Sequence, residues 1–251
     1  MSYFEELRAY FDAQDIELFC LEEVDSTNTF LKKRAAEHKM LAVALRQTAG
    51  RGRLGRAWSS EGENVYASFY YPAQQQEMGA VTLCVALAVS DAIRELGIET
   101  QIKWPNDIYA NDRKLCGILC ESIYEGAHLL GIVIGIGVNV NQEQFDAEIA
   151  ERAISIRNIL EREQNLAQVV LALKRHLDAW LERFFAQGFS PLQEEYQARS
   201  YLQGKEVCAG EAEGLCIGVS EEGDLLLKDE SGEVRRIRFG EVTQRIRPKE
   251  A

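Results

Sequence analysis

Apolar residues in the first third of the chain follow helix and strand periodicities in turn. Phe4, Leu7 and Phe11 recur at the spacing of one helix face, so residues 2–13 are predicted to form an amphipathic helix that Ser2 caps. The same reasoning predicts strands over residues 16–24, 41–46 and 64–71, and a helix over about 26–37.

The middle of the chain combines a buried helix with further strands. Residues 77–96 are apolar on nearly every side and stop at Gly97, as a buried helix with a C-terminal glycine does. Periodicity then predicts strands over 99–103, 114–123 and 128–140, and helices over about 166–187 and 191–202. These elements predict an α+β fold in which a mixed β-sheet is flanked by helices.

The pattern changes after Gly204. Residues 205–247 form short alternating segments separated by single glycines, which is typical of small strands joined by tight turns. We therefore expect a compact C-terminal β-barrel, with a domain boundary near residue 203. The two expected domains are residues 1–203 and 204–251.

Composition narrows the class of protein. The 251 residues include 46% hydrophobic positions and carry a formal net charge of −12, which argues against non-specific nucleic-acid binding. The N-terminus has no signal-peptide pattern and no apolar run reaches the length of a membrane span, so a cytoplasmic protein without membrane contact is expected. Six cysteines without a CxxC pair, and three scattered histidines, predict neither a disulfide framework nor a zinc site.

The most informative segment is Gly50-Arg51-Gly52-Arg53-Leu54-Gly55-Arg56, here called the Gly/Arg loop. Glycine lets backbone N–H groups approach a ligand closely, and guanidinium forks bind carboxylate or phosphate. The loop therefore favours a small anionic ligand over a merely solvated basic turn. Because three like charges repel one another with nothing to offset them, we expect the loop to be mobile without ligand.

Two nucleotide-binding motifs have glycines at this spacing, and both fit the chain poorly. A dinucleotide-binding turn requires a helix directly after the glycines, whereas Ala57-Trp58-Ser59-Ser60 reads as a loop. A kinase glycine-rich loop lacks its H-R-D and D-F-G partners.

Two segments beside the loop offer chemistry that could equally be structural. Trp58 could be a core anchor, as most tryptophans are, or could stack on a purine. In Lys103-Trp104-Pro105-Asn106-Asp107 the proline fixes a turn between a lysine suited to phosphate and a carboxylate suited to Mg²⁺ or a proton. A surface Lys–Asp pair in a hairpin accounts for this second segment equally well.

Three further segments carry weaker signals. Lys114 starts an apolar strand and could project into a pocket or simply be solvated. The glycines before Asn139 indicate close backbone approach by another group, and this asparagine could face adenine or end a strand. Ser26-Thr27-Asn28 could cap a helix, bind a neutral polar ligand, or do both.

Five segments together match one known family in order. They are Asp25-Ser26-Thr27-Asn28, then Gln47 with the Gly/Arg loop and Trp58, then Lys103-Trp104-Pro105-Asn106-Asp107, Lys114-Leu115-Cys116-Gly117-Ile118-Leu119 and Gly135-Ile136-Gly137-Val138-Asn139. On these motifs the chain resembles biotin–protein ligases, also called biotin–[acetyl-CoA-carboxylase] ligases, over nearly its whole length.

The resemblance implies a fold and a reaction. The fold is the biotin–lipoate ligase catalytic domain, similar to class II synthetases, followed by an SH3-like barrel. The enzyme uses ATP and Mg²⁺ to convert biotin into biotinyl-5′-AMP and then transfers biotin to a lysine of a biotin carboxyl carrier protein domain. The family also implies a monomer or a weak homodimer. Some members carry an N-terminal DNA-binding domain; the segment before Asp25 is too short for one, so transcriptional control is not expected.

The resemblance also implies roles for residues. Those expected to bind biotin are Ser26, Thr27, Asn28, Gln47, Gly50, Arg51, Arg53, Lys114 and Gly117. Those expected to bind the nucleotide are Arg51, Arg53, Arg56, Trp58, Asn106 and Asn139. The catalytic set is Arg53, Lys103, Asp107 and Lys114, with Asp107 as a candidate Mg²⁺ ligand.

Two rival functions compete with this one. A lipoate–protein ligase or octanoyltransferase shares the catalytic fold but lacks the arginine-spaced glycine loop. A non-catalytic nucleic-acid module would need basic patches interleaved with aromatic residues, and the acidic composition argues against that.

Overall fold

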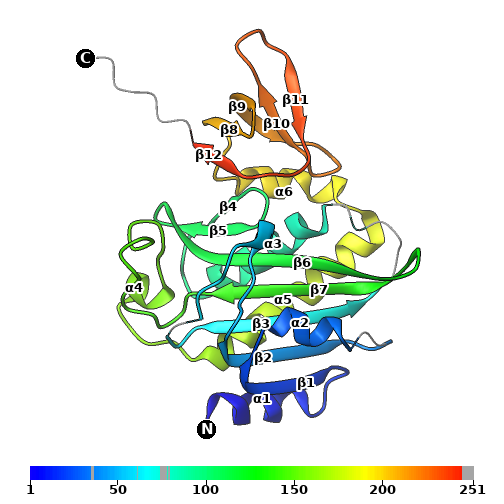
Figure 1. Ribbon diagram of the computed structural model, residues 1–251, viewed down its shortest axis with the longest axis vertical. Coiled ribbons are helices and arrows are strands. Elements are labelled where there is room, and N and C mark those ends of the chain that lie inside the picture. The colour runs from blue at the N-terminus through cyan, green and yellow to red at the C-terminus, as the bar shows by residue number, and fades with distance from the viewer. Residues whose placement is uncertain (35–36, 61, 74–77, 79, 245–251) are drawn as a thin grey trace.

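The computed structural model describes residues 1–34, 37–60, 62–73, 78 and 80–244. In this part of the chain a seven-stranded mixed sheet has the order β1-β2-β3-β7-β6-β5-β4 (Figure 1). Strands β1 and β2 are parallel, and the other neighbouring pairs are antiparallel. The expected α+β fold with a mixed sheet and flanking helices is thereby confirmed.

The elements of this first part have the following bounds. The strands are β1 Glu17–Val24, β2 Met40–Gln47, β3 Val65–Pro72, β4 Gln101–Lys103, β5 Asp107–Ala110, β6 Arg113–Glu125 and β7 His128–Val138. The helices are α1 Tyr3–Phe11, α2 Thr27–Lys32, α3 Val81–Arg94, α4 Ile156–Leu160, α5 Leu166–Gln187 and α6 Gln193–Ala198, with 3-10 turns at Arg53–Gly55 and Ser190–Leu192.

One face of the main sheet is the core. Alternate residues of the central strands, such as Phe69, Ile118 and Ile134, point to this face and are buried in one cluster with α3 and α5. In Figure 1 these two helices lie behind the sheet. The long helix α5 follows the apolar periodicity that predicted it.

The opposite face is only partly covered. Helix α2 packs there over a small apolar cluster that includes Leu31, Met40 and Tyr70, and it lies in front of the sheet in Figure 1. Beyond α2, strands β6 and β7 direct to this face three glycines, Gly117, Gly135 and Gly137, together with Leu119 and the charged Glu121. This open face is where the candidate site lies.

A second, antiparallel sheet follows residue 203. Its strands are β8 Glu206–Ala209, β9 Ala212–Val219, β10 Leu225–Lys228, β11 Val234–Ile237 and β12 Val242–Gln244, in the order β11-β10-β9-β8-β12. It rests on the first part through Trp104, whose buried indole N–H donates to the carbonyl of Gly223 at 3.0 Å. A separate set of small C-terminal strands was expected. The boundary at 203 stays a prediction.

Several element predictions were wrong in extent. Helix α2 ends at Lys32, well short of residue 37, and α3 starts at Val81; residues 35–36, 77 and 79 lie outside the described residues. Strand β5 and helix α4 were not predicted, because four or five residues are too short to show a period. The last predicted helix is a 3-10 turn followed by the short α6.

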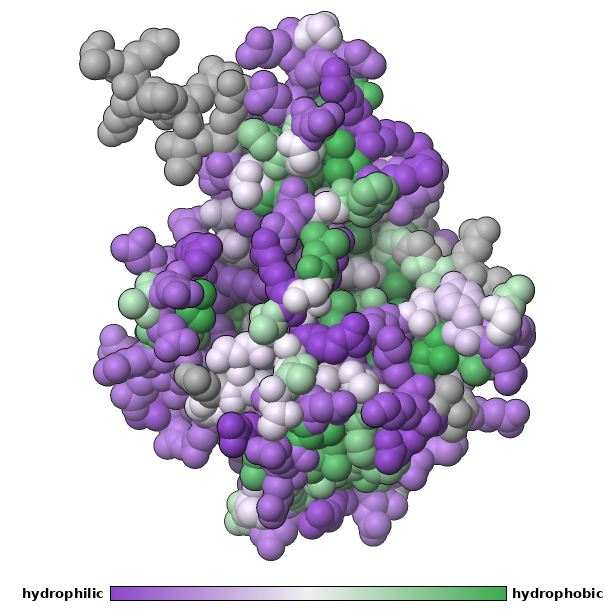
Figure 2. All heavy atoms as spheres, viewed as in Figure 1, coloured by the Kyte–Doolittle hydropathy of each residue, from purple (hydrophilic) through white to green (hydrophobic). Residues whose placement is uncertain are grey.

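No helix in the described part of the chain combines the length and apolar character needed to cross a membrane. Most of the face seen in Figure 2 is hydrophilic, and its apolar areas are separate from one another.

Candidate active site

The floor of the candidate site is formed by glycines of β6 and β7. Gly117 and Gly137 are register partners, and the indole of Trp58 lies directly on both. A Cβ atom on Gly137 would stand 2.5 Å from Trp58 Cε2, and one on Gly117 would stand 2.6 Å from its Cζ3. The close approach that the strand glycines predicted is therefore confirmed. The Trp58 Nε1 atom is buried there and has no hydrogen-bond partner in the described part of the chain.

The Gly/Arg loop is a small hairpin that carries Trp58 to this floor. The Gly52 N–H donates to the Arg56 carbonyl at 2.8 Å, and the Trp58 N–H donates to the Gly50 carbonyl at 2.9 Å. The tip turns through a left-handed conformation at Leu54, whose φ is 54°. The loop thus has a defined shape set by its own backbone hydrogen bonds.

Each arginine of the loop has a partner in the described structure. Arg51 Nη1 lies 3.2 Å from a carboxylate oxygen of Glu121. Arg53 Nη1 donates to Asn106 Oδ1 at 3.1 Å, and Arg56 pairs with Glu241 of the C-terminal sheet. The premise that nothing offsets the repulsion among these arginines was therefore wrong. Burial lowers the pKa of Arg53, and the neighbouring carboxylates oppose that shift.

The turn after β4 and the start of β6 meet beside Trp58. Lys114 Nζ lies 2.8 Å from Asp107 Oδ1 and 5.3 Å from the centre of the Trp58 ring. Lys103 and Asp107 are register partners on β4 and β5. Burial lowers the pKa of Lys103, while the charges of Asp107 and Glu241 act in the opposite direction.

Asp107 supplies an ion-paired oxygen to this site. Its Oδ1 is buried and lies 2.8 Å from Lys114 Nζ, and it accepts no hydrogen bond of good geometry from the described residues. Such an oxygen fits a hard cation such as Mg²⁺ or the proton of an amine. No cluster of three His, Cys, Asp or Glu side chains that could hold a metal occurs among the described residues.

A second polar group lies at the start of α2. Ser26 caps this helix, and its Oγ accepts from the Thr29 N–H. Gln47 Oε1 accepts from the N–H and the hydroxyl of Thr27 at 2.9 and 3.2 Å. Gln47 Nε2 in turn donates to Ser60 Oγ at 3.3 Å, which joins this group to the segment after the Gly/Arg loop.

Two asparagines expected at the ligand are mostly engaged within the protein. The Asn28 amide donates to the Leu119 carbonyl and to Glu121, and its Oδ1 lies 2.6 Å from Ser68 Oγ. Its side chain is therefore held within the protein, and its expected contact with biotin stays a prediction. The Asn139 amide donates to two main-chain carbonyls, so its Oδ1 is the end suited to face adenine.

The structure also brings in residues that the sequence did not indicate. Glu121 and Ser68 lie on the open face of β6 and β3, and Glu241 reaches Arg56 from the C-terminal sheet. A single charge inside an apolar strand, two positions beyond Leu119, was a signal for Glu121. Nothing in the sequence pairs Glu241 with the Gly/Arg loop, 185 positions away.

Comparisons with known proteins identify the family. Residues 20–139 match the model of the biotin/lipoate A/B protein ligase family. The bifunctional ligase/repressor BirA of Escherichia coli is 33% identical over 235 residues, which are 88% of this chain and 72% of that protein. The chain belongs to this family. Biotin–[acetyl-CoA-carboxylase] ligase of Paracoccus denitrificans is 29% identical, over 84% of this chain and 94% of its own length.

The fold of this ligase-family chain also matches solved structures of relatives. Biotin protein ligase from Aquifex aeolicus in complex with biotin and ATP superposes with a TM-score of 0.82 and 33% identity. The match covers 91% of this chain and 98% of that one, so it extends beyond residue 203. The resemblance to biotin–protein ligases is thereby confirmed.

Proposed function

We propose that this chain is an ATP-dependent ligase that converts biotin into biotinyl-5′-AMP and transfers biotin to a lysine of a biotin carboxyl carrier protein domain. One observation carries the proposal. The open face of the main sheet gathers a bare glycine floor, the Trp58 indole, and the charged pair Lys114–Asp107 beside it. Relatives named as biotin–[acetyl-CoA-carboxylase] ligases support the carrier class.

In the first step two anions must meet. A carboxylate oxygen of biotin attacks the α-phosphorus of ATP, the bond to the β-phosphate breaks, and pyrophosphate leaves. Arg53 and Lys114 lie on either side of the Asn106–Asp107 turn and lower the repulsion between the two anions. Arg51, Gly50 and Gly117 hold the carboxylate end of biotin, and Thr27 with Gln47 holds its polar ring.

The nucleotide lies on the other side of this centre. The Trp58 indole stacks on adenine, Asn139 accepts from the adenine amine, and Arg56 contacts the phosphates. Mg²⁺, which the family implies, would bind Asp107 together with phosphate oxygens; when bound it neutralises charge on the leaving pyrophosphate.

In the second step an amine must lose a proton. The acceptor lysine attacks the acyl carbon of biotinyl-5′-AMP, the bond to phosphate breaks, and AMP leaves. The Asp107 carboxylate, whose Oδ1 is ion-paired with Lys114, takes the proton of that amine, and Lys103 stabilises the leaving AMP. Asp107→Asn should therefore slow transfer more than adenylate formation in single-turnover assays. An equal fractional loss of rate in the two steps, or no loss in either, would refute this role.

We also propose a setting for the enzyme. It works in the cytoplasm as a monomer or weak homodimer, without nucleic acid, with a catalytic domain at 1–203 and an SH3-like domain at 204–251. The acidic composition supports the absence of nucleic-acid binding.

Intact mass spectrometry tests the function. The protein is incubated with ATP, Mg²⁺, biotin and a biotin carboxyl carrier domain, and the carrier should gain one biotinyl group. A parallel incubation replaces biotin with lipoate and a lipoyl carrier domain. Modification in the lipoate reaction alone would assign the rival activity of the same fold.

A further inference from the structure

Glu121 is a partly buried carboxylate on the open face of the main sheet. It lies on β6 opposite Val133 of β7, and its side chain is 15% exposed. It falls on the same side of the strand as Gly117, two residues beyond Leu119. The proposed function gives this carboxylate no direct contact with biotin or ATP.

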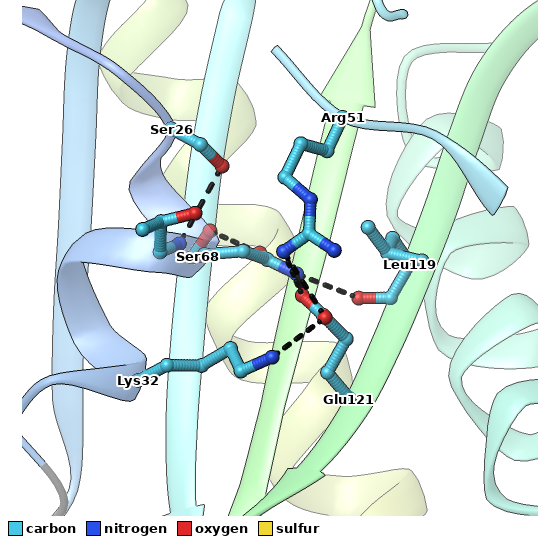
Figure 3. A network of polar contacts seen from close by, with 8 residues as sticks. Ser26, Lys32, Arg51, Ser68, Leu119 and Glu121 are labelled. Carbon is cyan, nitrogen blue, oxygen red and sulfur yellow. Dashed lines mark hydrogen bonds and ion pairs between the residues drawn. The ribbon is translucent and has the colours of Figure 1, made fainter. Parts of the chain in front are cut away.

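Three donors from two separate segments converge on Glu121, as Figure 3 shows. Lys32 Nζ and Asn28 Nδ2 come from α2 and lie 2.8 and 3.0 Å from its oxygens. Arg51 comes from the Gly/Arg loop, with its Nη1 at 3.2 and 3.3 Å from the two oxygens. Glu121 is therefore the point at which the Gly/Arg loop is tied to α2.

The charge balance makes Glu121 necessary to this arrangement. Burial alone would raise the pKa of its carboxyl, but hydrogen bonds from Lys32 and Asn28 and the charges of Lys32 and Arg51 outweigh burial and lower the pKa. The carboxylate is therefore ionised at neutral pH. Without it, two cations would face each other across a half-buried site, and Arg51 would lose its one anionic partner among the described residues.

Asp178 offers a comparison from the opposite face of the sheet. This carboxylate of α5 also receives two cations and one neutral donor, Lys39 at 3.1 Å, Lys174, and the Tyr71 hydroxyl at 3.0 Å. All three partners belong to the scaffold of helices and strands or its immediate ends. Glu121 differs because one partner belongs to the loop that carries Arg53 and Trp58 to the glycine floor.

We infer that Glu121 is a positioning residue of the ligase, which seats the Gly/Arg loop over the glycine floor by holding Arg51. Through Asn28 it also reaches the hydroxyl of Ser68, which lies 2.7 Å from that of Thr27. The seat of the loop and the binding site for the polar ring of biotin thus share one anchor. This inference rests on the proposed function and adds a residue that holds the loop without touching the reacting atoms.

Glu121→Gln tests the inference, because it keeps the size of the side chain and removes its charge. We expect KM for biotin to rise about tenfold and bound biotinyl-5′-AMP to escape about tenfold faster, while kcat for adenylate formation stays within about threefold. Trypsin should cut the ligand-free variant at Arg51 to Arg56 several times faster than wild type. Glu121→Asp, which keeps the charge, should raise KM less than Glu121→Gln.

Asp178→Asn is the matched control. It should lower the thermal midpoint and leave KM for biotin within about twofold of wild type. Arg51→Met should raise KM by itself, and adding Glu121→Gln to it should bring little further change, because both act through one contact. Coupling of Glu121→Gln with Lys32→Met instead would make Glu121 an anchor of α2 alone and overturn the inference.

The trypsin measurement separates this inference from the proposed function, since it needs no substrate. If Glu121→Gln is cleaved faster but the wild-type protein biotinylates no carrier, the role of Glu121 in holding the loop would stand and the proposed ligase function would be rejected. Equal cleavage and equal KM in an active ligase would reject the anchor alone. If Glu121→Gln does not fold, Arg51→Met decides from the other side of the contact: cleavage of its ligand-free form at Arg53 and Arg56 at the wild-type rate would overturn the inference.

Discussion

Strands β6 and β7 present two faces made from alternate residues of the same segments, and the two faces differ in what fills them. On one face Ile118, Ile134 and Ile136 are almost fully buried against α3 and α5. On the other, Gly117 and Gly137 leave bare backbone, which Trp58 contacts directly. Because successive side chains of a strand point to opposite faces, one segment of sequence supplies both a core face and the floor of the candidate site.

Stability and chemistry are separated between these two faces. Branched side chains on the helix-covered face supply most of the apolar burial. Glycines on the open face stabilise little by themselves but admit an indole, or a ligand in its place, to the backbone. At neighbouring positions of β7, a substitution on the helix-covered face should therefore mainly reduce stability, and one on the open face should mainly reduce activity.

The largest expected effect is on folding, at Ile134. Ile134→Ala removes a fully buried side chain from the core and should lower the free energy of unfolding by about 2–5 kcal/mol. Urea denaturation measures this loss. Below the new midpoint, kcat/KM of the folded variant should stay within a few-fold of wild type. A large loss of activity without loss of stability would contradict the separation of the two faces.

The next effect is on activity, one residue along, at Gly135. A Cβ here would stand 2.2 Å from Oδ1 of Asn28, whose amide is already fixed by three partners. Gly135→Ala should therefore displace Asn28 and lower kcat/KM on the order of 100-fold, which is about 2.7 kcal/mol. Pyrophosphate exchange and calorimetric titration with biotin measure this loss.

Gly214→Ala serves as the control for Gly135→Ala. Its Cβ would stand 2.5 Å from the Lys228 carbonyl in the C-terminal sheet, a comparable clash outside the floor of the site. It should cost stability and leave biotin affinity close to wild type. If both variants lost biotin affinity equally, the effect at Gly135 would be one of general folding.

The division between the faces was partly predictable from the sequence. The glycines of the segment from Gly135 to Asn139 indicated close approach by another group, and Asn28 and Trp58 are the groups that approach. Long periodic elements such as α5 were predicted within a residue or two. Local patterns of this kind reflect local causes, namely side-chain direction and backbone sterics.

The pairs that join distant segments could not be predicted. Glu121 and Arg51 are 70 positions apart, and Arg56 and Glu241 are 185 apart. Which charge meets which depends on the order of strands in the sheet, and a single sequence does not encode that order in any local pattern. The premise that nothing offsets the repulsion among the arginines of the Gly/Arg loop was wrong for this reason.

A smaller effect is expected at Gly137, where the obstructing group can move. A Cβ there would stand 2.5 Å from Trp58 Cε2, and this side chain belongs to a surface loop. Gly137→Ala should displace the indole and raise KM for ATP about tenfold, or about 1.4 kcal/mol, measured by pyrophosphate exchange. Adding Trp58→Ala should bring little further loss, because both changes act on the same contact. Fully additive losses would show that the alanine acts elsewhere.

The smallest effect is expected at low pH, where the partly buried carboxylates Glu121 and Asp178, on opposite faces of the sheet, should respond differently. Attraction to their cationic partners holds the pKa of Glu121 below its ordinary 4.5 and that of Asp178 below 3.8, against the opposing effect of burial. A carboxyl whose pKa is lower in the folded state stabilises the protein above its ordinary pKa, and this stabilisation is lost as pH falls through the folded value.

Because Lys32 and Arg51 are partly exposed, their ion pairs with Glu121 contribute less than about 1 kcal/mol to the free energy of unfolding. Protonation of Glu121 also frees Arg51, so biotin affinity should weaken as pH falls through the lowered pKa of Glu121, whereas protonation of Asp178 should affect folding alone. Titration with biotin from neutral pH down to about pH 4 measures this, and the affinity of Glu121→Gln should depend less on pH than that of wild type. Parallel pH curves for the two proteins would place the acid response outside this carboxylate.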